Sequence, residues 1–212
     1  MNVSKRMMRN PVFVDENDSM KKAMDLLKER EIRHLPVLRD GEKLVGILSE
    51  RDIKQASPSP ATALEIREIY YLLDKVKVKQ IMTRRPYTVS SSAPIEEAAL
   101  IIREKKIGCL PVVEDGRLVG ILTETDILDA FIEAMGVSGP GYRMELSLPN
   151  RPGMLFEVLK LMKDFEANVV SVATAAHDDT DRKILILRLE AKNYKVLKAA
   201  VKKAGFEMLS AD

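Results

Sequence analysis

The feature that most constrains the fold of this chain is an internal repeat. Residues 3–14 (VSKRMMRNPVFV) recur as residues 78–89 (VKQIMTRRPYTV) with an offset of 75 residues. The similarity continues from REIRHLPVLRDGEKLVGILSERDI to KKIGCLPVVEDGRLVGILTETDI, with one residue missing after the Asp-Gly pair of the second copy. A similarity of this length in constant register indicates two copies of one supersecondary unit. We therefore expect two matched modules, followed by an unrelated C-terminal third.

Both copies predict the same order of elements. Apolar residues spaced as on one helix face come first, followed by a short strand, an Asp-Gly hairpin turn, a returning strand and a second helix. Each copy is therefore predicted to be β-α-β-β-α, and two copies can pack their sheets as a pseudo-twofold pair. The expected helix, strand, strand and helix start are residues 20–27, 34–38, 44–48 and 49 in the first copy, and residues 95–102, 109–113, 118–122 and 123 in the second.

The C-terminal third predicts a strand, a helix, two strands, a helix and a final strand. This β-α-β-β-α-β order is typical of a ferredoxin-like fold, so the fold class is α/β (α+β). Between the repeats, Thr62 and Glu65 fit a capping box at the start of a linking helix. The predicted division of the chain is residues 1–56, a linker helix at 57–77, residues 78–135, a flexible linker at 136–141 and residues 142–212.

Composition excludes several classes of function. The net charge is +2 with cations and anions interspersed, so no basic field indicates nucleic acid. No apolar run is long enough to span a bilayer, and the N-terminus lacks the apolar core of a signal peptide. Cys109 is the only cysteine, so no internal disulfide can form, and we expect a reducing cytoplasm. With only His34 and His177 and no metal or nucleophile motif, we expect neither an enzyme, a metal site nor a catalytic cofactor.

The stretches GILSERDI and GILTETDI allow two interpretations. Ser49 and Thr123 can each cap a helix, and Asp52 and Asp126 can complete the capping box and face the positive end of the helix dipole. Alternatively, the two matched strand-to-helix junctions hold the same kind of ligand. The four-residue pattern by itself favours capping, whereas the matched Leu-Pro-Val segment upstream in both copies favours a ligand site.

Both repeats resemble the CBS domain, and the tandem resembles a Bateman module, because each copy matches the signature Gly-apolar-X-Ser/Thr-X-X-Asp. The resemblance implies two sites for an adenosyl ligand: AMP, ADP, ATP or S-adenosylmethionine. The aspartate would accept hydrogen bonds from the ribose hydroxyls, the Ser or Thr would lie beside the ribose or phosphate, and apolar residues would flank the adenine. The implied first site is Ser49, Asp52, Arg51, Arg33, His34, Leu35, Pro36, Ile32 and Val12; the second is Thr123, Asp126, Ile107, Leu110, Pro111 and Thr88.

The two sites are not expected to be equivalent. Arg33, His34 and Arg51 of the first copy correspond to Gly108, Cys109 and Thr125 of the second. The first site is therefore richer in cations, and we expect a polyphosphate ligand to favour it.

The C-terminal third resembles the ACT domain through NRPGMLFEV at its first strand-helix junction. The resemblance implies that Asn150, Gly153, Met154 and Leu155 face an amino-acid effector between paired sheets. Asn150 stands where the family more often has aspartate, which removes a charge that would attract an α-amino group. The alternatives are that Asn150 is only a helix N-cap with Pro152 near the first turn, and that the domain mainly pairs subunits into a homodimer.

The combination of a CBS pair with an ACT domain resembles AcuB-type acetoin-utilisation proteins. This resemblance implies a regulatory protein that senses an adenosyl ligand and is a candidate to act on a partner enzyme. From the charge pattern and the short apolar runs we expect no nucleic-acid or membrane partner. The competing hypotheses are an architectural subunit with no ligand of its own and, least favoured by the residues, an enzyme.

Overall fold

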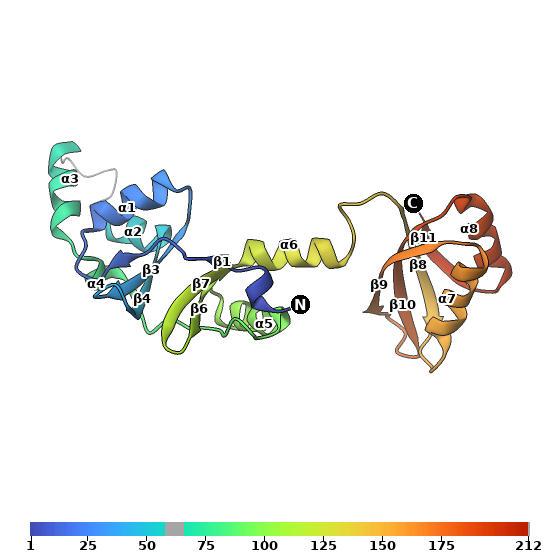
Figure 1. Ribbon diagram of the computed structural model, residues 1–212. Helices are drawn as coiled ribbons and strands as arrows, with labels where there is room; N and C mark the ends of the chain where they lie inside the picture. Colours follow the sequence, from blue (N-terminus) through green and yellow to red (C-terminus); the bar gives the residue numbers. More distant parts are fainter. Residues whose placement is uncertain (58–65, 212) are drawn as a thin grey trace. The chain divides into compact units, whose positions relative to one another are not determined.

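The computed structural model describes residues 1–57 and 66–211, with the backbone alone over residues 66–70 (Figure 1). The chain divides into two compact units, Met1–Ile127 and Leu128–Asp212. The predicted linking helix is present as α3 (Ile66–Lys75), whereas the capping box expected at Thr62 and Glu65 lies outside the described residues.

Within the first unit, both repeats fold as predicted. Each contains a helix, a β-hairpin and a second helix. The hairpins turn through two consecutive left-handed residues, Asp40 and Gly41 (φ 54° and 71°) and Asp115 and Gly116 (φ 47° and 77°), as the Asp-Gly pairs indicate. The elements are α1 (Met20–Glu29), β3 (His34–Arg39), β4 (Lys43–Ser49) and α2 (Glu50–Ala56), then α5 (Ile95–Lys105), β6 (Cys109–Glu114), β7 (Arg117–Thr123) and α6 (Glu124–Ala134), which begins in this unit.

The first segment of each repeat crosses to the hairpin of the other repeat. The short strand β1 (Met8–Arg9) pairs with β7, and β5 (Thr83–Arg84) pairs with β4 in the matching register. The two hairpins also meet where Lys43 pairs with Arg117, which gives the strand order β1-β7-β4-β3-β2, with β2 formed by Val14–Asp15. A folded module therefore contains residues of both sequence repeats.

Burial of apolar side chains explains this exchange. Val3 is fully buried in the core of the second repeat, and Val78, 75 residues later, is fully buried in the core of the first. Val78 lies in the single-turn helix α4 (Val78–Ile81), and Val3 in a matching 3₁₀ turn (Val3–Lys5). Each buried valine contributes roughly 1.5–3 kcal/mol, so leaving these segments unpaired would be costly.

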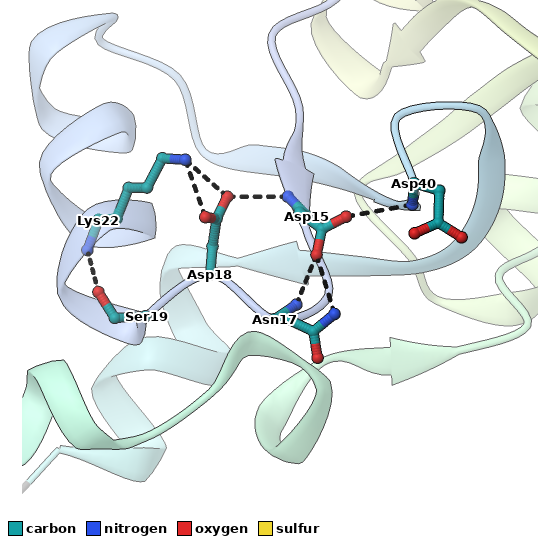
Figure 2. Close-up of polar contacts among 6 residues, drawn as sticks. All are labelled: Asp15, Asn17, Asp18, Ser19, Lys22 and Asp40. Atoms are coloured by element: carbon teal, nitrogen blue, oxygen red, sulfur yellow. Dashed lines mark hydrogen bonds and ion pairs between the residues drawn. The ribbon is translucent and has the colours of Figure 1, made fainter.

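The polar segment before α1 forms a closed hydrogen-bond network (Figure 2). Ser19 Oγ accepts a hydrogen bond from Lys22 N at 3.3 Å, and Asp18 accepts one from Asp15 N at 2.9 Å. Asp15 in turn accepts from Asp40 N at 3.2 Å, and Lys22 Nζ pairs with Asp18. Ser19 caps α1, and the two aspartates tie the segment before the helix to the hairpin and to Lys22 in the first turn.

The second unit has the predicted ferredoxin-like topology. Its sheet is antiparallel with the order β11-β8-β10-β9, and α7 and α8 lie on one side of it (Figure 1). Leu146, Leu185 and Leu187 pack in the core between sheet and helices. The elements are β8 (Tyr142–Pro149), α7 (Met154–Asp164), β9 (Asn168–Ala176), β10 (Arg182–Glu190), α8 (Tyr194–Lys203) and β11 (Glu207–Ala211).

Two local features of this unit bear on the expectations for it. The N-cap of α7 is Gly153 rather than Asn150, because the chain turns at φ 90°, a conformation that glycine adopts without strain. The segment expected to be a flexible linker begins with hydrogen-bonded turns, Gly136 N to Glu133 O and Gly139 N to Gly136 O, and Arg188 donates to Gly139 O.

Candidate functional site

A cavity of about 1250 Å³ lies at the start of α2, in front of the first Ser-X-X-Asp motif. It is formed by both repeats, because β5 and the chain after it run along β4. Its lining comprises Arg33, His34, Ile47, Ser49, Glu50, Arg51, Asp52, Lys54, Gln55, Thr83, Arg84, Arg85, Pro86, Tyr87, Lys106, Ile107, Gly108, Cys109 and Glu124. The volume is ample for a nucleotide-sized ligand.

Asp52 uses one carboxylate oxygen to complete a capping box. Its Oδ2 accepts hydrogen bonds from Ser49 N and Ser49 Oγ, both at 2.7 Å, and Asp52 N donates to Ser49 Oγ at 3.2 Å. Among the described residues, nothing donates a hydrogen bond to the other oxygen, Oδ1. Asp52 lines the cavity, so this oxygen is the acceptor left for a ligand.

The second motif repeats this geometry. Asp126 Oδ2 accepts from Thr123 N at 2.7 Å and from Thr123 Oγ1 at 2.6 Å, and Asp126 N donates to Thr123 Oγ1 at 3.3 Å. Its Oδ1 likewise accepts no hydrogen bond from the described part of the chain. Capping and ligand binding are therefore compatible interpretations, because each uses a different oxygen of the same carboxylate.

His34 stands where the two repeats meet. A Cβ added to Gly108 would lie 3.0 Å from both Cε1 and Nε2 of the His34 ring, so only glycine fits there without displacing the imidazole. Burial lowers the pKa of His34, and the carboxylates of Glu124 and Asp52 oppose that shift. Beside it, burial and Glu124 raise the pKa of the Cys109 thiol to about 12, which keeps the thiol protonated.

The cavity brings together Ser49, Asp52, Arg51, Arg33 and His34, as the sequence predicted for the first site. It also contains cations that sequence reasoning did not assign to it. These side chains are Lys54, Arg84, Arg85 and Lys106. Arg84 and Arg85 belong to the segment that crosses between the repeats. The pairing of β5 with β4 sets their position, and a strand of two residues is too short to be predicted from a sequence pattern.

The apolar walls differ from those expected. Ile107, expected in the second site, lines the cavity of Asp52, because the crossing places residues of the second repeat beside the first motif. Four predicted wall residues of the two sites, Leu35, Pro36, Leu110 and Pro111, are buried inside the modules. The partly buried Val12 and Ile32 pack against the first core and do not line this cavity, and Thr88 is exposed.

The turn before α7 exposes three of the four residues predicted for an ACT effector. Asn150, Gly153 and Leu155 are exposed, and Asn150 N donates to Asp181 O at 2.7 Å. Open space surrounds the position where a Gly153 Cβ would lie. Met154 is only 7% exposed and packs in the core, so its side chain does not face a ligand at this turn.

Two family models match the chain. The CBS domain model matches residues 3–59 and again 78–133, and the TTHA0829-like ACT domain model matches residues 140–211. Together they span both repeats and the C-terminal unit.

Solved structures resemble the CBS-matching part. One is a putative acetoin utilization protein (AcuB) from Vibrio cholerae, with 29% identity over 65% of this chain and 95% of that one, at a TM-score of 0.54. A second is the CBS domain pair of protein MJ0100 in complex with 5-methylthioadenosine and S-adenosyl-L-methionine, with 30% identity over 62% and 99% of the chains and a TM-score of 0.52. A third is CBSX2 from Arabidopsis thaliana in complex with AMP, with 34% identity over 62% and 96% and a TM-score of 0.50.

Some relatives are enzymes that carry a matching region. They include homoserine O-acetyltransferases and an inosine-5′-monophosphate dehydrogenase, in which the match spans 22–23% of the relative's length. Over the residues that the structure describes, no helix of this chain is both long and apolar enough to pass through a membrane.

Proposed function

This chain belongs to the CBS domain family and carries a C-terminal ACT domain of the TTHA0829-like type, and from that premise we propose that it is a non-catalytic regulatory protein. Its CBS pair binds an adenosyl ligand as a signal. The ligand shifts an equilibrium between two states of the protein by binding one of them more tightly.

The observation that carries this proposal is the hydrogen bonding of the two motif aspartates. Asp52 and Asp126 are each held by their own helix start through Oδ2, while Oδ1 is left without a partner among the described residues. A positioned carboxylate is a strong, charge-assisted acceptor for the hydroxyl groups of a ribose. Because the capping bonds already hold the side chain, little rotamer freedom remains to be lost on binding.

The similar structures support an adenosyl ligand. The ligands in the MJ0100 and CBSX2 complexes are S-adenosyl-L-methionine, 5-methylthioadenosine and AMP, which share the adenine and the ribose and differ in the 5′ substituent. All three ligands carry a ribose, so a site that binds any of them needs an acceptor for its hydroxyl groups. Both modules have such an acceptor.

For the ACT domain we propose a role in pairing subunits into a homodimer. Its edge strand β9 exposes Val170 and Val172 by 40% and 41%, and an edge strand with exposed apolar residues favours pairing with another chain. An amino-acid effector at the turn of Asn150 and Gly153 is the alternative, supported by their exposure. Size measurement by light scattering, with and without the twenty amino acids, separates these two roles.

A link to acetoin utilisation and a partner enzyme are part of the proposal, and both rest on the likeness to the Vibrio cholerae protein. The competing function is an architectural subunit whose motifs only cap helices. It gains support from the capping boxes themselves, which are complete without any ligand.

Titration calorimetry of the full chain with AMP, ATP and S-adenosylmethionine tests the proposal. We expect saturable binding of at least one of them, accompanied by a rise in melting temperature because the ligand binds only the folded state. Absence of binding to all three at millimolar concentration would refute the sensor function and leave the architectural one. Mass spectrometry of small molecules released from the denatured protein provides a second readout.

A further inference from the structure

We propose that the cavity of Asp52, called the first cleft below, selects adenosine ligands that carry a 5′-phosphate over neutral or cationic ones. This inference rests on the proposed function and narrows it to one chemical class of ligand for one of the two motifs. The second motif provides the comparison for charge, since its capping geometry is the same.

Positive charge dominates the first cleft. Of the described residues that line it, six are Arg or Lys and three are Asp or Glu. Glu50 is already paired with Lys54 at 2.6 Å, and Asp52 is placed to accept from the ribose. No carboxylate in the described chain forms an ion pair with Arg33, Arg51, Arg85 or Lys106, although the charge of Arg33 helps to lower the pKa of Glu50. A phosphate in this cleft therefore meets cations that are not held in ion pairs of their own.

The corresponding positions of the other repeat lack this charge. Subtracting the repeat offset of 75 residues relates Arg85 to Asn10 and Lys106 to Glu31, and adding 74 relates Arg51 to Thr125. The backbone supports the first two pairs, because all four residues are left-handed: φ is 51° at Arg85 and 49° at Asn10, and 54° at Lys106 and 52° at Glu31. These three differences make the first cleft more positive by four charges than the equivalent positions around the second motif, which are Asn10, Glu31 and Thr125.

Arg85 adds an argument from backbone strain. A left-handed conformation costs energy for most residues but is better tolerated by asparagine, which the first repeat has at this position. Arginine has no such local advantage, and its exposed side chain lines the cleft without an ion-pair partner in the described chain. A side chain that is unfavourable for its own backbone but adds charge to a cavity is typical of a functional position.

The same charges disfavour a sulfonium ligand. S-adenosylmethionine carries a positive sulfur next to the ribose, where AMP carries its negative phosphate. Bringing that sulfonium into a cavity with an excess of cations is repulsive. The first cleft therefore discriminates by the sign of the charge on the 5′ substituent.

The test is calorimetry of the full chain in an Asp126→Asn background, in which the second motif cannot accept from a ribose. Adenosine, AMP, ATP and S-adenosylmethionine are titrated at low and high salt. We expect AMP and ATP to bind about tenfold or more tighter than adenosine at low salt, S-adenosylmethionine to bind more weakly than adenosine, and the phosphate advantage to shrink at high salt.

Arg85→Asn is the decisive variant, because asparagine suits the left-handed backbone and the fold should be kept. We expect ATP binding to weaken by roughly fivefold to tenfold, with adenosine binding unchanged. Arg103→Gln removes one charge from the exposed face of α5, away from the cleft, and should leave both affinities unchanged.

The outcomes separate the two proposals. If adenosine and S-adenosylmethionine bind as tightly as ATP, or if Arg85→Asn weakens adenosine and ATP equally, phosphate selection is overturned while the adenosyl site stands. If none of the four ligands binds to the unmodified chain, the proposed function itself fails.

Discussion

Replacing Asp52 by asparagine or by alanine separates the structural role of this side chain from its role in binding. Asparagine can keep its amide oxygen where Oδ2 accepts from Ser49 N, and it then presents NH₂ in place of Oδ1, the oxygen that has no partner in the described chain. Alanine removes both groups. The two variants therefore differ in capping but share the loss of the ribose acceptor.

The magnitudes follow from the hydrogen bonds. Asp52→Ala loses two bonds to Oδ2 at 2.7 Å and a favourable charge at the start of α2. We expect a loss of about 1–2 kcal/mol in the free energy of unfolding, or a fall in melting temperature of roughly 2–8 °C. Asp52→Asn should lose at most about 1 kcal/mol. Both should bind an adenosyl ligand about ten- to a hundredfold more weakly, equivalent to roughly 1.5–3 kcal/mol.

The assay is calorimetric titration with AMP together with thermal unfolding, in the Asp126→Asn background so that only the first cleft reports. Ser19→Ala is the matched control. It removes the N-cap of α1, which accepts from Lys22 N, and should lower stability by about 1 kcal/mol with no change in affinity. If Asp52→Asn binds AMP as tightly as the unmodified chain, the carboxylate is a helix cap only, and the reasoning is refuted.

Three further outcomes are expected. Gly120→Ala should lower the free energy of unfolding in urea by about 1–3 kcal/mol, because the new Cβ would lie 2.9 Å from Met8 O and force β1 away from β7. An unchanged unfolding midpoint would contradict the pairing of β1 with β7. Cys109 should react slowly with a thiol reagent at pH 8 in the native protein and quickly in urea, since its pKa is raised to about 12; rapid native labelling would contradict its burial. Because the pKa of His34 is lowered in the folded protein, the unfolded chain binds the proton more readily. The free energy of unfolding should therefore be highest above about pH 6.5 and decrease as the pH falls below that value. His34→Gln should flatten this part of the pH profile.

The elements and the motifs were predictable because their signals are local. The repeat gave the same helix and hairpin twice, and the Asp-Gly pairs predicted turns whose left-handed φ values the structure shows at Asp40 and Asp115. The capping boxes at Ser49 and Thr123 could also be read from four residues each. The alternative that Asn150 is the N-cap of α7 does not hold, because a left-handed Gly153 takes that position without any polar side chain.

The membership of the cleft could not be predicted in the same way. Leu35 and Pro36 lie next to His34 in the sequence, yet they are buried in the module while His34 faces the cavity. Arg85 and Lys106 are distant in sequence from the motif that they accompany. Position along a strand or turn decides which neighbour faces inward, and a repeat alignment does not carry that information.

The amino-acid sequence by itself determined two copies of one module, a ferredoxin-like third unit and the position of each carboxylate at a helix start, since periodicity, turn chemistry and capping act over a few neighbouring residues. Only the tertiary structure decided that the first segment of each repeat completes the module of the other one. That choice depends on burying Val3 and Val78 in opposite cores, a gain that exists only once both modules have formed. The crossing brings Arg84 and Arg85 to Asp52, and so it sets the charge of the first cleft.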